Sequence, residues 1–209
     1  MKKLLLLIII TLALLAGCKG KPLTRKELVA MIETGEDVTQ VDTSEITDMS
    51  ELFRRNRGFN QDISGWDVSN VIDMSDMFCG ADSFNQNISG WDVSHVTDMS
   101  DMFFAAYSFN QDISGWDVSS VTDMIDMFDE ASSFNSDISE WDVSQVTDMS
   151  AMFMWAKSFN QDISGWDVSR INPPPVVLRP GRKLPQTGNG QISAFSVIYN
   201  NQNQTRNYQ

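Results

Sequence analysis

The sequence predicts an α/β fold, a right-handed β/α solenoid of 25-residue repeats with a helical cap at its N-terminal end. Three observations predict it. One residue pattern recurs every 25 residues, each unit combines a strand pattern with a short helical pattern, and a separate helix signal precedes the first unit. A fixed period of roughly 20 to 50 residues is typical of repeat proteins, because each unit buries its apolar face only against its neighbours.

Columns of identical residues, which are the residues at the same position in successive units, define the repeat. One column is Trp66, Trp91, Trp116, Trp141 and Trp166, and others begin at Met49, Phe53, Phe59 and Asn60. The units occupy 46–70, 71–95, 96–120, 121–145 and 146–170 without insertion or deletion. We interpret the methionine, phenylalanine and tryptophan columns as core, and we predict that the asparagine column bonds turn backbone as a ladder.

Each unit contains two hydrophobic periods. Trp66 and Val68 flank Asp67, which is the alternation of a strand. Met74, Met77, Phe78 and Ala81 then follow the spacing of a short helix, with Asp73 and Asp76 placed as an acidic capping box. A strand and a helical turn in 25 residues is the plan of a leucine-rich repeat, so the predicted fold is leucine-rich-repeat-like.

The two ends of the repeat region differ from its middle. Thr24 to Glu27 reads as a capping box that opens a helix to about Glu33, and Gly35 is placed to end it. A degenerate repeat follows, so 23–45 is predicted as the N-terminal cap. From 171 to 209 we predict a Pro-rich segment and then a flexible basic tail, either native or left by a truncated or frameshifted gene.

The first residues read as a targeting signal. A basic start precedes an apolar run over 4–16, which is too short to span a bilayer. The run ends in Leu-Ala-Gly-Cys, which resembles the lipobox of bacterial lipoproteins. We therefore expect 1–17 to be a lipoprotein signal peptide, Cys18 to be lipidated and 18–22 to be a linker; the alternative is an ordinary signal peptide. The predicted location is the bacterial cell envelope, lipid-anchored and surface exposed, in the outer membrane if the cell is Gram-negative.

Composition excludes several function classes. The formal net charge of −13 argues against nucleic acid and against anionic lipid, so membrane contact is expected through the lipid anchor only. One histidine, His95, and two cysteines leave little material for a metal cluster or a nucleophile–base pair. We therefore expect a protein that is not an enzyme, with no catalytic residues, metal site, cofactor or small-molecule substrate.

The repeat itself resembles a known family. The phrase F-N-Q-D-I-S-G-W-D-V-S at 109–119, with V-T-D-M at 121–124, is similar to the repeat of BspA-like leucine-rich-repeat surface lipoproteins, a mycoplasma-type lipoprotein repeat also found in other host-associated bacteria. The resemblance covers about 38–171. It implies a surface-exposed, non-catalytic protein, with adhesion or host-protein binding proposed for relatives.

Two sets of residues are candidates for binding. The first is an outward acidic row, Asp67, Asp92, Asp117, Asp142 and Asp167. Like charges at strand spacing repel, so either serine and glycine donors offset the repulsion or cations such as structural calcium lie between them. The second is the variable segment after each Met-Phe pair, with a basic island at Arg54, Arg55 and Arg57 and aromatic anchors at Phe104, Tyr107 and Trp155. Neutral drift at tolerant positions is the alternative for this segment.

Together these features predict a lipid-anchored, non-catalytic surface protein that binds a protein or other macromolecule of a host or neighbouring cell, in the manner of an adhesin. The alternatives are a structural spacer, possibly stabilised by calcium, and a truncated remnant of a longer repeat protein.

Overall fold

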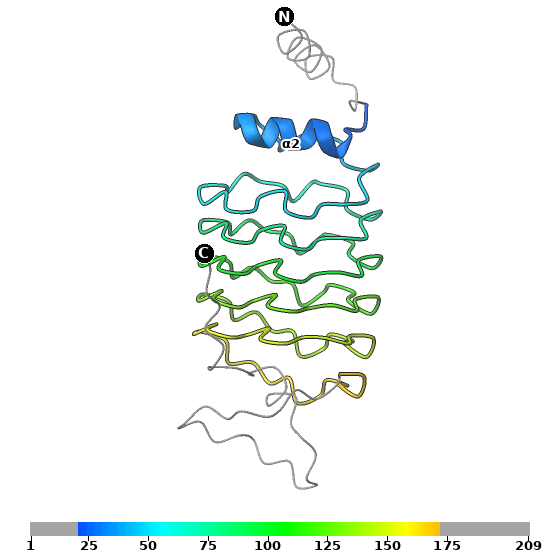
Figure 1. Cartoon of the computed structure of the whole chain (residues 1–209), viewed down its shortest axis with the longest axis vertical. Coiled ribbons are helices and arrows are strands. Elements are labelled where there is room, and N and C mark those ends of the chain that lie inside the picture. The colour runs from blue at the N-terminus through cyan, green and yellow to red at the C-terminus, as the bar shows by residue number, and fades with distance from the viewer. Residues whose placement is uncertain (1–20, 172–209) are drawn as a thin grey trace, which may run out of the picture.

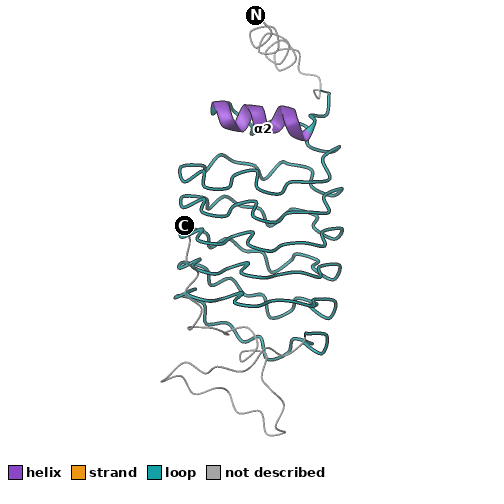
Figure 2. Ribbon diagram, in the orientation of Figure 1, coloured by secondary structure: helices purple, strands orange, loops and turns teal. Residues whose placement is uncertain are grey.

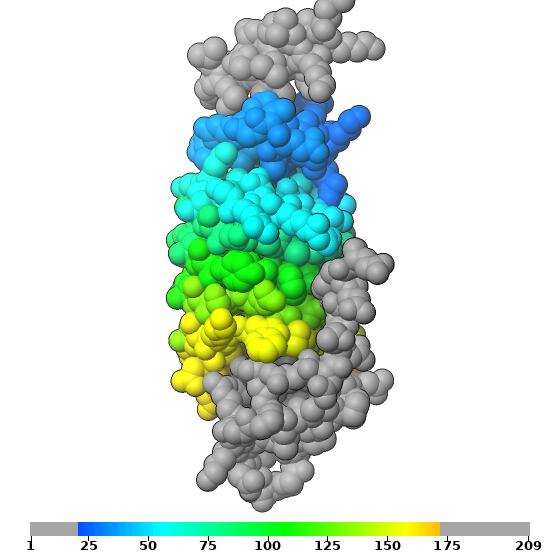
Figure 3. Space-filling view, turned by 60° about the vertical axis from the view of Figure 1, so that its left-hand side comes forward, coloured from blue at the N-terminus to red at the C-terminus, as the bar shows by residue number. Residues whose placement is uncertain are grey.

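The computed structural model describes residues 21–171, and the predicted signal peptide, the predicted lipidation site Cys18 and the residues after 171 lie outside this range. The described chain consists of helix α2, Arg25–Thr34, followed by a stack of coils that each take 25 residues. Figure 1 shows these coils one below another along the long axis, with α2 lying across one end. In Figure 3 successive coils are in contact along the whole described column.

Helix α2 begins and ends where the sequence predicted. The backbone N–H of Thr24 donates to the Glu27 carboxylate at 2.9 Å, and the Glu27 N–H donates back to the Thr24 hydroxyl at 3.3 Å. Gly35 closes the helix in the left-handed conformation, with φ of 73°. The hydrogen bonds from Thr24 lower the pKa of Glu27. The predicted capping box and helix are therefore confirmed.

The coils contain neither the regular strands nor the short helices that the sequence predicted. Within residues 21–171, α2 is the only helix, and strand pairing is limited to isolated parallel bridges such as Asp48 with Asp73. Figure 2 accordingly shows the coils as loops and turns. The predicted helix over 74–81 and the predicted strand around Asp67 are wrong, although the alternation of buried Trp66, exposed Asp67 and buried Val68 holds.

Backbone hydrogen bonding explains why no helix forms. In the first coil the N–H groups of Met49, Glu51, Phe53 and Arg55 donate across to the carbonyls of Asp73, Ser75, Met77 and Cys79 in the next coil. Of the amides between them, those of Leu52 and Arg54 donate to the carbonyl three residues back, and that of Ser50 donates to the Asp48 side chain. Every second amide is thus committed to a neighbouring coil, whereas an α-helix would use it internally.

The backbone conformation matches this alternation. Glu51 and Arg55 have positive φ of 58° and 59°, and the equivalent residues of the later coils repeat these values. Asp76 has φ of 56°, so it cannot be the third residue of a helix. The predicted acidic capping box is wrong, and Asp73 instead accepts the N–H of Ser75 at 2.9 Å in an Asx turn.

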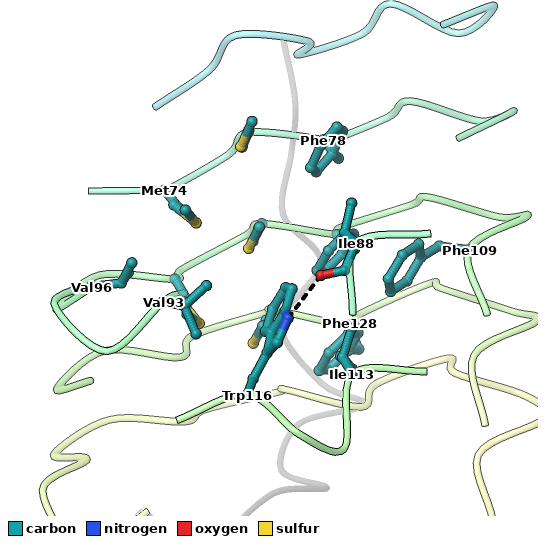
Figure 4. Packing of buried hydrophobic residues seen from close by; sticks show 14 of the residues in the cluster. Met74, Phe78, Ile88, Val93, Val96, Phe109, Ile113, Trp116 and Phe128 are labelled. Carbon is teal, nitrogen blue, oxygen red and sulfur yellow. Dashed lines mark hydrogen bonds between the residues drawn. The ribbon is translucent and has the colours of Figure 1, made fainter. Parts of the chain in front are cut away.

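The interior is built from ladders of identical side chains. Phe53 and Phe78 stack with ring centroids 5.4 Å apart, and the Trp91 and Trp116 rings are 6.5 Å apart and within 3° of parallel. The Nε1–H of Trp116 donates to the carbonyl of Ile88 at 3.1 Å (Figure 4). All five repeat tryptophans make this bond to the residue 28 positions earlier. The core assignment of the methionine, phenylalanine and tryptophan columns is confirmed.

Polar ladders bind the turns of each coil to the next. The Oδ1 atom of Asn60 accepts the backbone N–H of Asn85 at 2.9 Å, and the bond recurs along the column to Asn160. The predicted asparagine ladder is therefore confirmed. Each full coil also contains Asx turns, in which the side chain of an Asp or Asn accepts the backbone N–H of the residue two positions later, usually a serine. The first column of these turns begins at Asp37, inside the N-terminal cap.

Candidate functional site

The outward acidic row is exposed, and serine donors hold each of its carboxylates. Asp67 accepts the backbone N–H and the hydroxyl of Ser69 at 3.1 and 2.7 Å. Each further member accepts the N–H of the serine two residues on. These bonds lower the pKa of Asp92, Asp142 and Asp167. Serine donors thus offset the repulsion that is expected between the like charges of this row.

The variable segments all lie on one edge of the stack, because they occupy the same four positions of each coil. The second position is left-handed in every coil, at Arg55, Gly80, Ala105, Glu130 and Trp155. The third is a buried alanine in four coils and the half-buried Asn56 in the first. Within these four positions, residue identity therefore changes mainly at the first, second and fourth, while the second keeps the same left-handed backbone.

The basic island is largely neutralised by the next coil. The Nη1 atom of Arg54 lies 3.0 Å from Asp76 Oδ2 and 3.4 Å from Glu51 Oε2. The Nε atom of Arg57 lies 3.8 Å from Asp82 Oδ2. Burial works against the charge of Arg54, but the nearby carboxylates raise its pKa overall. The sequence predicted three available cations; within residues 21–171 two of them have carboxylate partners, and Arg55 has no ion pair.

Two of the three aromatic candidates are prominent on the surface. Tyr107 is 43% exposed and Trp155 is 44% exposed, whereas Phe104 is half-buried. The hydroxyl of Tyr107 donates to Glu130 Oε2 at 3.0 Å, and this bond raises the pKa of the tyrosine. Sequence reasoning missed a third exposed apolar side chain, Ile72, which is 51% exposed. Its signal was visible, since Ile72 replaces the threonine of the repeat.

An acidic cluster on the same edge was also missed. Asp129 is only 3% exposed and Asp126 only 4% exposed. The Oδ1 atom of Asp129 is buried without a hydrogen-bond partner. Burial, with the charges of Asp126, Glu130 and Asp101, raises the pKa of Asp129 to about 8. The signal was the pair Asp129-Glu130 at positions that other coils fill with Arg-Arg, Cys-Gly, Phe-Ala and Met-Trp.

Two further features of the described residues bear on the site. Across 21–171, no three or more His, Cys, Asp or Glu side chains are grouped so that they could hold a metal ion. No helix in that part of the chain is long and apolar enough to cross a membrane. The thiol of Cys79 is buried, and burial together with Asp76 raises its pKa to about 12, so it stays protonated.

The stack and its variable edge define a repeat protein of 25-residue coils, in which residue identity changes along one edge. Residues 26–118 and 87–177 match the family described as "Mycoplasma protein of unknown function, DUF285". The chain therefore belongs to this mycoplasma repeat family. No curated protein and no solved structure matches the chain.

Proposed function

We propose that the chain is a lipid-anchored bacterial surface protein that binds a protein or other macromolecule of a host or neighbouring cell and catalyses no reaction. One observation carries the proposal. Residues as different as Arg55, Glu130 and Trp155 occupy the same left-handed backbone position, with φ between 58° and 61°. The coil therefore presents different side chains at its surface without altering its core, as a recognition surface requires.

The anchor and the fold class are parts of the same proposal. The lipobox at Leu15–Cys18 supports attachment through Cys18, and the 25-residue period supports a relation to right-handed leucine-rich-repeat solenoids that lack a helix in each unit. Changing Cys18 to serine should abolish metabolic labelling with palmitate and release the protein from the membrane fraction. Continued labelling of C18S would contradict lipidation at this residue.

Binding is tested with the full chain against a panel of extracellular-matrix and plasma proteins. We expect saturable binding that Y107A/W155A abolishes, because large exposed aromatic side chains supply most of the energy of such contacts. The matched control is Ile72→Thr, which removes an exposed apolar side chain away from the variable edge and restores the repeat pattern. A folded chain that binds nothing on the panel would contradict the proposal.

A structural spacer is the second candidate, and the regular ladders from coil to coil favour it. Its calcium-stabilised form predicts a lower Tm in saturating chelator. An unchanged Tm would remove calcium from the proposal, because the serine hydrogen bonds would then be enough to hold the acidic rows.

A further inference from the structure

The last coil, 146–170, presents a row of backbone donors at the end of the stack. In each earlier coil alternate amides donate to carbonyls of the next coil, as the N–H of Phe128 donates to Met152 at 2.9 Å. Three equivalent amides of the last coil form what we call the donor face: Met149, Ala151 and Phe153. Among residues 21–171 no carbonyl accepts from these three amides. The donor face therefore has room for a segment that supplies carbonyl acceptors.

The apolar interior also continues to this end. Phe153 stacks on Phe128 of the previous coil, with ring centroids 5.7 Å apart, and on Phe159 of its own coil at 4.0 Å. In the middle of the stack the equivalent ring, Phe103, has a stacked ring in the coil on either side. Within the described range Phe153 has such a ring on one side only. The segment that docks here should therefore bring apolar side chains as well as carbonyls.

A second copy of the chain does not offer this combination. Its own donor face presents N–H groups, and donors do not bond to donors. Its first coil carries the matching carbonyls, but α2 lies across that end of the stack (Figure 1). Arg25 already donates to two of them, those of Asp48 and Ser50. The two ends of the stack are therefore not complementary to each other.

The repeat register continues to the edge of the described residues. The N–H of Ile171 donates to the Val168 carbonyl at 3.1 Å, as that of Val146 donates to Val143 at 3.0 Å. Ile171 is also buried, like Val146. The second match to the mycoplasma repeat family extends to residue 177. The residues directly after 171 are therefore the segment in register with the donor face.

These residues supply both of the required features. Each bond from coil to coil joins an amide to the carbonyl 24 positions later, such as Met49 to Asp73. For the donor face, the carbonyls 24 positions later belong to Pro173, Pro175 and Val177. The residues 25 positions after Met152 and Phe153 are Val177 and Leu178, which are apolar. Acceptors and an apolar cover thus occur together in 172–178.

The prolines of this segment suit a face that offers only donors. In an extended segment the N–H and the carbonyl of one residue point to the same side, so an accepting residue also directs its N–H at the donors. Pro173 and Pro175 have no N–H, and a residue that precedes proline is extended. Pro174 would face away from the stack, where its missing N–H leaves no donor for another chain.

We propose that residues 172–178 dock on the donor face as an extended C-terminal cap. The carbonyls of Pro173, Pro175 and Val177 accept from the three amides, and Val177 and Leu178 cover the ring of Phe153. The cap closes the end of the stack opposite α2, so neither end is open to pairing with another chain. This inference is independent of the proposed binding function.

The experiment is amide hydrogen exchange of the full chain, resolved by NMR. We expect the amides of the donor face to exchange at least about a hundred-fold more slowly than unprotected amides. V177D/L178D places two charges against the apolar end of the stack and should accelerate their exchange by at least about ten-fold. The amide of Phe78, which donates to Met102 inside the stack, reports whether the variant stays folded.

The matched control is V197D/I198D, the same pair of substitutions in a second apolar stretch at 192–199. Exchange at the donor face should stay within about two-fold of the unmodified chain in this control. If V177D/L178D does not fold, L178S is measured in its place and the same acceleration is expected.

Three results would overturn the inference. The first is exchange of the donor-face amides at the rate of unprotected amides in the unmodified chain. The second is acceleration by V197D/I198D, or none by V177D/L178D, which would show that 172–178 is not the segment that docks. The third is protection that increases with protein concentration, which would assign the donor face to a second copy of the chain.

Discussion

The guanidinium of Arg25 donates from Nη2 to the carbonyl oxygen of Ser50, and from Nε to that of Asp48 at 3.1 Å. In the next coil the equivalent carbonyls, of Asp73 and Ser75, accept backbone N–H groups from the coil before them. Over this part of its length the first coil has α2 before it instead of another coil. Arg25 thus supplies, from the helix, the donors that a preceding coil would have supplied.

Replacing Arg25 with methionine should therefore destabilise the stack from its N-terminal end. Two carbonyls lose charge-assisted donors at a partly exposed site, and we expect a loss of about 1–3 kcal/mol in the free energy of unfolding. Urea unfolding followed by tryptophan fluorescence measures it. Arg55→Met is the matched control, since Arg55 is exposed without an ion pair in the described chain. Equal losses in the two variants would contradict the capping role.

Replacing Trp116 with phenylalanine should also destabilise the chain. The ring is buried, and the change removes the donor to the Ile88 carbonyl while keeping an aromatic side chain in the ladder. An unsatisfied buried carbonyl and lost packing together should cost about 2–4 kcal/mol. Trp155→Phe, the same substitution at an exposed position, should cost under about 1 kcal/mol. Thermal unfolding compares the two variants. An unchanged Tm in W116F would show that this hydrogen bond makes no net contribution to stability.

Asp129 should make stability fall as pH rises. Its pKa is about 8 in the folded chain and near 3.9 in an unfolded chain. Between these values the folded state holds a proton that the unfolded state has released, so the unfolding free energy decreases with pH in this window and levels off above about 8. The Tm of D129N should decline less between pH 5 and 8 than that of the unmodified chain. D112N serves as the control, and equal slopes in all three proteins would refute the prediction.

Cys79 should be unreactive in the folded protein. A thiol with a pKa of about 12 contains almost no thiolate at neutral pH, and its side chain is buried. In a C18S chain, where Cys79 is the only thiol, labelling with a disulfide reagent should be at least about a hundred-fold slower than in urea. Fast labelling without denaturant would mean that the edge around Asp76 opens readily.

Local patterns in the sequence predicted the helix and the core correctly. The capping box at Thr24 depends on residues three apart, and such a signal works without tertiary context. The Trp66 and Phe59 columns predicted the core because a large apolar residue at every period has to be buried in each coil. The same reasoning failed over 74–81, where a helical spacing of methionine and phenylalanine coexists with left-handed Asp76.

The exposure of the variable edge was predicted correctly only in part. Tyr107 and Trp155 were expected at the surface, and both are exposed there. Arg54 was expected as an available cation, but a residue 22 positions away, Asp76, lies against it. The buried carboxyl of Asp129 was not anticipated, because an acidic residue in a variable segment is ordinarily solvated.

By itself the sequence determined the 25-residue period, the residues of the core and the start and end of α2, since each depends on identity or on spacing along the chain. Tertiary structure alone decided which amides bond within a coil and which bond to the next, and which charges become partners. Both depend on the register between coils. Residues 25 positions apart become neighbours there, and their hydrogen bonds and charges outweigh the local preference for a helix.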